Sequence, residues 1–126
     1  MELMTAQIAR RWRLEQLGLI LLDTTWKSGD PAFAPRKQMT FAHKDFDAGM
    51  SDYDDAAYTR DYRRMMIESW RVNKDHWLKI INTPGVVVLG CYCKSGKFCH
   101  RHLLAGFFKE ICEKQKLPYT YYGEFE

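Results

Sequence analysis

The stretch "GVVVLGCYCKSGKFCHRHLLAGFFKEIC", residues 85–112, decides the fold of this chain. Its apolar part, VVVLGCY at 86–92, is rich in β-branched residues and does not alternate with polar ones, which is typical of a central strand covered on both faces. A short basic loop containing a glycine follows, and apolar residues at helical spacing run from 99 to 114. A buried strand that passes through a loop into a helix is the basic unit of an α/β fold.

Other apolar segments extend this unit in both directions. LILLD at 19–23 predicts a second buried strand, and YTYYG after Pro118 predicts a last one. Ser51 has the residue type and position of a helix N-cap. The helices that we expect lie at residues 5–17, 37–48, about 51–72 and 74–81.

Strands separated by helices predict a parallel sheet. The 126 residues, 46% of them apolar, suit a single domain at 1–126. The predicted fold is therefore a small Rossmann-like α/β three-layer sandwich with a short, mainly parallel sheet. Ligands of such sheets bind beyond the carboxyl ends of the strands, so we expect the loops after Asp23 and Cys91 to meet at the functional edge.

Composition limits the classes of function. The formal net charge of +3 favours an anionic ligand weakly, but 19 Lys and Arg interleaved with 16 acidic residues do not form the basic stripe of a nucleic-acid-binding protein. No apolar run is long enough to cross a membrane, and the N-terminal residues do not read as a secretory signal. We expect a cytoplasmic protein without a membrane partner, whose four cysteines are free thiols.

The loop after Cys91 has the features of an anion site. Gly96 permits a tight turn, and the free N–H groups where the helix begins attract negative charge. Arg101 could bind a phosphate or carboxylate through two parallel hydrogen bonds, and Asp23 on the facing loop could bind a ribose hydroxyl. The expected ligand-binding residues are Asp23, Thr24, Thr25, Lys27, Cys91, Lys94, Ser95, Gly96, Lys97 and Arg101.

Thiol chemistry is an alternative for the same loop. A thiol at a helix N-terminus beside lysine and histidine has a lowered pKa, so Cys93 or Cys99 could act as a nucleophile. CKSGKF at 93–98 is similar to the loop of a rhodanese-like sulfurtransferase, although the usual arginine is missing. His100 is the expected acid or base, because the pKa of histidine lies nearest neutrality. The candidate catalytic residues are thus His100, Cys99 and Cys93.

The loop also contains the atoms of a zinc site. These are supplied by Cys91, Cys93 and Cys99 with His100 or His102. Because the spacing lacks the usual CxxC pair, we predict no metal and no cofactor from the sequence.

VVVLGCYCKSGKFCHRHLLA resembles the signature of an uncharacterised family of small bacterial and phage proteins, domain of unknown function 488. Those proteins carry an apolar strand, one or two cysteines, a short loop and then Cys-His-Arg at the start of a helix, here residues 99–101. Their first strand ends in an aspartate followed by a polar loop with Pro and Phe, as Asp23 and TTWKSGDPAFAP do here. The resemblance spans about residues 19–124.

The resemblance implies a Rossmann-like fold and a nucleotide-like or nucleoside-derived ligand. The compact phage-encoded members are the most similar, which implies a role in nucleotide metabolism or in countering nucleotide-based host defence. This chain has Thr24 and Thr25 where relatives often have an arginine, so we do not assign the family's chemistry for that loop to this chain. Whether the chain is an enzyme stays open, as do a non-enzymatic role as inhibitor of a host protein and a homodimer.

Overall fold

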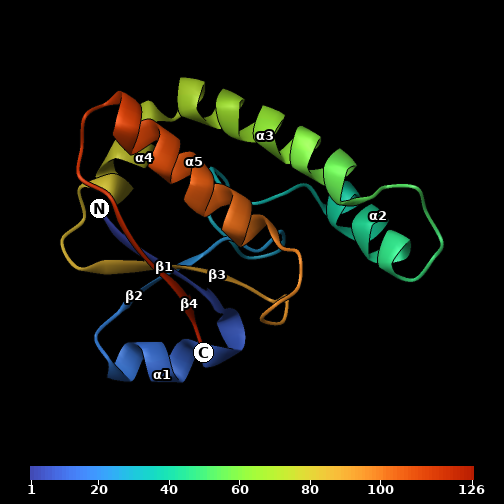
Figure 1. Ribbon diagram of the computed structural model, residues 1–126, viewed down its shortest axis with the longest axis horizontal. Helices are drawn as coiled ribbons and strands as arrows, with labels where there is room; N and C mark the ends of the chain where they lie inside the picture. Colours follow the sequence, from blue (N-terminus) through green and yellow to red (C-terminus); the bar gives the residue numbers. More distant parts are fainter.

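The computed structural model describes residues 1–126 and contains one four-stranded sheet (Figure 1). Its strands, in the spatial order β2-β3-β1-β4, are β2 (Ile20–Asp23), β3 (Val86–Cys91), β1 (Glu2–Gln7) and β4 (Thr120–Phe125). Every neighbouring pair is parallel. The predicted α/β fold with a parallel sheet is therefore confirmed.

Helices cover both faces of the sheet. They are α1 (Arg11–Gln16, after a 3₁₀ turn at Ile8–Arg10), α2 (Lys37–Asp47), α3 (Asp55–Val72), α4 (Lys74–Ile81) and α5 (His100–Lys114). In Figure 1, α1 lies on one side of the sheet and α3, α4 and α5 lie on the other. This arrangement is the expected three-layer sandwich.

The expected helix at 5–17 is wrong in its first part. Glu2–Gln7 forms β1, which pairs with β3 on one side and β4 on the other. Leu3 is fully buried in the large core on one face and Ala6 in the small core on the opposite face, as expected of a central strand. The helical spacing of apolar residues was misleading, since Trp12 is 76% exposed. Pairing with two strands overrides the local pattern.

The larger core lies between the sheet and the helices α3, α4 and α5. Phe33, Trp77 and Phe108 form its aromatic centre, with ring centroids 4.8 and 4.9 Å apart for the two pairs that involve Trp77. On α3, Tyr62 is fully buried and its hydroxyl donates to the carbonyl oxygen of Phe33 at 2.6 Å. The long loop from 24 to 36 is thus anchored in the core.

The N-cap of α3 differs from the expected Ser51. The side chain of Asp54 accepts a hydrogen bond from the backbone N–H of Ala57 at 2.9 Å and caps the helix. The Ser51 hydroxyl donates to the carbonyl oxygen of Ala42 and accepts from Tyr53 N–H, so it stabilises the turn between α2 and α3. Both residue types are favourable N-caps, and the sequence pattern does not distinguish them.

Two glycine substitutions should have opposite effects on stability. A Cβ on Gly29 would lie 2.4 to 2.6 Å from backbone atoms of Thr24 and Thr25, which cannot move without displacing the loop. We expect Gly29→Ala to lower the free energy of unfolding by about 3 kcal/mol. Gly106, in the middle of α5, has open space around it, so Gly106→Ala should raise that free energy by about 1 kcal/mol. Urea denaturation measures both, and equal stability of the two variants would contradict the described loop.

Candidate functional site

The carboxyl ends of β2 and β3 bring two loops together, as expected. Asp23 is the register partner of Gly90. The next residue, Thr24, donates to the carbonyl oxygen of Gly90 from its backbone N–H at 3.0 Å and from its hydroxyl at 2.9 Å. The loop at 24–36 therefore begins in fixed register beside the loop at 92–99.

A cavity of about 560 Å³ lies at this edge. The expected site residues that line it are Thr25, Cys91, Cys93, Lys94, Gly96, Lys97, Cys99 and His100. The other expected residues, Asp23, Thr24, Lys27, Ser95 and Arg101, are not part of the lining. The structure thus gathers most of the predicted set around one cavity and places the remainder beside it.

Sequence reasoning missed the opposite wall of the cavity. This wall comes from α2 and the start of α3 and consists of Thr40, His43, Lys44, Asp47, Asp55 and Tyr58. The Nε2 atom of His43 lies 2.6 Å from a carboxylate oxygen of Asp55, and its ring packs 4.9 Å from that of Phe98. Nothing in the spacing of these residues distinguishes them from an ordinary amphipathic surface, so no sequence signal could have found them.

Arg101 is a structural residue in this arrangement. Its side chain is fully buried, and its Nε and Nη2 atoms donate to the two carboxylate oxygens of Glu124 at 3.1 and 2.6 Å. Nη1 donates to the carbonyl oxygen of Cys93 at 2.9 Å. Burial alone would lower the pKa of Arg101, but the hydrogen bond to Glu124 and the negative potential of Cys99, Glu124 and Cys91 together outweigh burial and raise it. The guanidinium therefore joins α5 to β4 and to the loop, and it does not reach the cavity.

Asp23 caps its own loop. Its carboxylate accepts hydrogen bonds from the backbone N–H of Thr25 at 2.8 Å, from the Thr25 hydroxyl at 2.7 Å and from the Ser28 hydroxyl at 2.7 Å. Burial raises the pKa of Asp23, yet the bonds from Ser28 and Thr25 together outweigh that effect and lower it. With its oxygens used in this way, Asp23 shapes the loop and has little capacity left for a ribose hydroxyl.

His100 is buried and its tautomer follows from its partners. Nε2 lies 2.7 Å from the carbonyl oxygen of Thr24, which can only accept, so Nε2 carries the proton. Nδ1 is then the bare nitrogen, and it lies 3.8 Å from the Sγ atom of Cys91 and 3.7 Å from that of Cys99. Burial lowers the pKa of His100 to about 4, so the ring is neutral at physiological pH.

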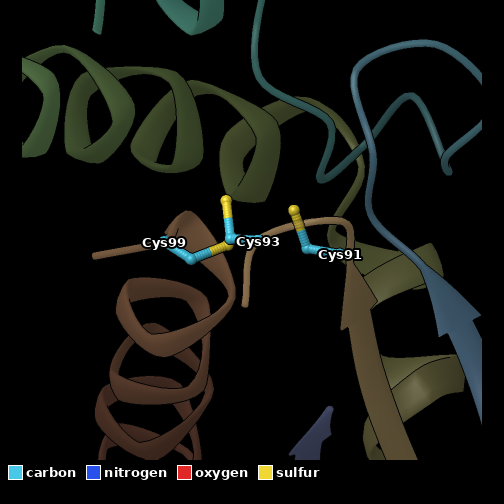
Figure 2. Close-up of side chains that lie close together, drawn as sticks. All are labelled: Cys91, Cys93 and Cys99. Carbon is cyan, nitrogen blue, oxygen red and sulfur yellow. The ribbon is translucent and has the colours of Figure 1, made fainter. Parts of the chain in front are cut away.

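Three thiols form a cluster here, and two of them contact this nitrogen. Figure 2 shows Cys91 from the end of β3, Cys93 from the loop and Cys99 from the residue before α5, with their side chains gathered in one place. Their Sγ atoms all lie within 4.8 Å of one another. The neighbouring thiols of Cys91 and Cys99 lower the pKa of Cys93, whereas the pKa values of Cys91 and Cys99 are themselves raised within the cluster. Negative charge in the cluster is therefore favoured on Cys93.

A family model described as the active DUF488-N3 subclade matches residues 8–111. The chain belongs to the DUF488 family. The matched region of this DUF488 protein contains both loops, the α2–α3 wall and the thiol cluster, whereas β1 and β4 lie outside it. Comparison with curated proteins and with solved structures gives no match. No helix combines the length and the apolar character needed to cross a membrane.

The buried ion pair of Arg101 with Glu124 should contribute strongly to the stability of the protein. Glu124→Gln leaves a buried guanidinium uncompensated, so we expect the free energy of unfolding to fall by about 3 kcal/mol in urea denaturation. The matched control is Glu110→Gln, which breaks the exposed pair with Arg63 and should change that free energy by less than about 0.5 kcal/mol. Similar effects of the two substitutions would show that the pair with Arg101 is not buried.

Proposed function

We propose that this DUF488 protein binds a small phosphate-bearing, nucleotide-like or nucleoside-derived ligand in the cavity between the loops 24–36 and 92–99. The observation that carries the proposal is the position of two lysines on the loop that leads into α5, at the carboxyl end of a parallel sheet. Ligands of open α/β sheets bind at this place. A volume of about 560 Å³ lies within the usual range for small-molecule sites, which is ~300–1,000 Å³.

The charges around the cavity favour an anion. Lys94 and Lys97 are exposed on one wall and Lys44 lies on the other. The two acidic side chains of the lining, Asp47 and Asp55, both lie within 4 Å of ring nitrogens of His43. The carboxylates are thus partly engaged within their own wall, while the lysine ammonium groups are available to a phosphate.

The start of α5 adds to this positive potential. No side chain caps the helix at Cys99, unlike α3, which Asp54 caps. The first N–H groups of a helix have no partner within the helix, and they carry the positive end of its dipole. A phosphate held by the two lysines would lie near these groups, a common arrangement for anions.

Aromatic side chains supply the apolar part of the cavity. Trp26 is half-buried and contacts Phe41 edge-on at 5.4 Å, and Phe98 packs against His43. Tyr92 is 56% exposed at the rim. Such faces can stack on a base, which favours a nucleotide over inorganic phosphate. The setting implied by the family resemblance is nucleotide metabolism or nucleotide defence signalling in a phage and its host.

Ligand-induced stabilisation tests this proposal. Nucleoside mono- and diphosphates, NAD-derived compounds and inorganic pyrophosphate are screened by thermal shift, where a ligand at a hundred times its dissociation constant adds about 2.7 kcal/mol. We expect at least one nucleotide to stabilise the protein, and Lys94→Ala/Lys97→Ala to weaken its binding more than tenfold because charge-assisted contacts to the phosphate are lost.

The matched control is Lys79→Ala/Lys109→Ala, which removes the same charge from exposed positions outside the cavity. It should leave the affinity unchanged. A screen in which no anion stabilises the protein, or in which both double variants lose the same affinity, would contradict the proposal.

A further inference from the structure

Three sulfur atoms and a ring nitrogen that contacts two of them lie where β3 passes into α5. They are the Sγ atoms of Cys91, Cys93 and Cys99 and the Nδ1 atom of His100. Cys91, Cys99 and His100 are each at most 5% exposed, and Cys93 is half-buried. These four atoms are different from the lysines and the backbone N–H groups that would bind the anion.

The distances that involve Cys91, Cys99 and His100 fit a tetrahedral zinc ion. Zn–S bonds of ~2.3 Å and Zn–N bonds of ~2.0–2.1 Å give S···S edges of ~3.8 Å and S···N edges of ~3.6 Å. The Nδ1 atom of His100 lies 3.8 and 3.7 Å from two of the sulfurs. The three sulfurs lie within 4.8 Å of one another, but this group does not include His100, so the side chain of Cys93 must turn toward Nδ1 to complete the tetrahedron.

The surroundings of His100 are those of a metal ligand. A histidine that binds a metal commonly donates its other ring N–H to a carbonyl oxygen or a carboxylate, which fixes the tautomer. Here Nε2–H donates to the carbonyl oxygen of Thr24 at 2.7 Å and leaves the lone pair of Nδ1 directed at the sulfurs. In the structure the contacts of Nδ1 are with sulfur.

Simple packing accounts less well for this cluster. The remaining cysteine, Cys112, shows what a packed thiol looks like: it is fully buried within the large apolar core on α5, away from other cysteines. A disulfide would use two of the three clustered sulfurs and leave the third beside the bare nitrogen. A metal ion uses all four donor atoms.

We propose that Cys91, Cys93, Cys99 and Nδ1 of His100 bind Zn²⁺ and thereby fasten the loop between β3 and α5. Binding releases the thiol protons to solvent, and three thiolates with one Zn²⁺ carry a net charge of −1. Arg101 is already paired with Glu124, so the cations that offset this charge are Lys94 and Lys97 of the same loop. Four protein ligands close the coordination sphere, so the role of the ion is structural. The sequence alone predicted no metal, so this proposal departs from that prediction.

Metal analysis tests the site directly. The protein, purified under reducing conditions without chelator, should contain one zinc per chain by plasma mass spectrometry. Replacement of zinc by Co²⁺ should give thiolate-to-metal charge-transfer bands and the intense visible absorption of tetrahedral cobalt. Cys93→Ala should weaken Co²⁺ binding more than tenfold, since even loss of an outer-sphere partner costs 10- to 100-fold.

Cys112→Ala is the matched control, because it removes a cysteine outside the cluster, and it should retain one metal per chain. Circular dichroism shows whether each variant is folded, and the cobalt spectrum of the unaltered protein needs no variant at all. Zinc-free protein that gives no tetrahedral cobalt spectrum on reconstitution would overturn the proposal. So would equal loss of metal in Cys93→Ala and Cys112→Ala. Neither result depends on nucleotide binding, so this site and the anion site can fail separately.

Discussion

The candidate site depends on one buried hydrogen bond, between the Nε2–H of His100 and the carbonyl oxygen of Thr24. It joins the first residue of α5 to the first residue after β2, two positions 76 residues apart in the chain. Thr24 is itself fixed on Gly90 of β3 by two hydrogen bonds. The ends of β2 and β3 and the start of α5 are therefore one unit. Removal of this bond would leave buried polar groups unpaired, which is costly.

Two other interactions complete the unit and decide what remains free for a ligand. Asp23 uses its carboxylate to close the turn at Thr25 and Ser28, and Arg101 uses its guanidinium on Glu124 and on the carbonyl oxygen of Cys93. Asp23 and Arg101 are of residue types that often contact ligands, but here both hold the loops and β4 in place. The residues that remain free to contact a ligand line the cavity. They are chiefly the lysines of the 92–99 loop and the aromatic side chains.

Sequence reasoning succeeded where local pattern and topology agree. The apolar run at 86–91, the helix from 100 and the short strand ending at Asp23 follow from periodicity, and parallel pairing then requires their carboxyl ends to meet. It failed at β1, where apolar spacing also fits a helix and the deciding partners, β3 and β4, lie more than 75 residues away. Glu124 was also hidden as the partner of Arg101, because its position depends on where β4 lies in the sheet. The spacing of the cysteines likewise gave no sign of how closely the folded loop brings their sulfurs together.

The protonation state of His100 is the property that decides whether β2, β3 and α5 are joined as described. Ring ¹⁵N chemical shifts, assigned by their loss in His100→Gln, report which nitrogen carries the proton. We expect a protonated Nε2 and a Nδ1 that is bare or metal-bound, with no proton uptake between pH 6 and pH 8, because burial lowers the pKa of this histidine to about 4. A protonated Nδ1, or titration near the ordinary histidine pKa of about 6.5, would contradict this expectation.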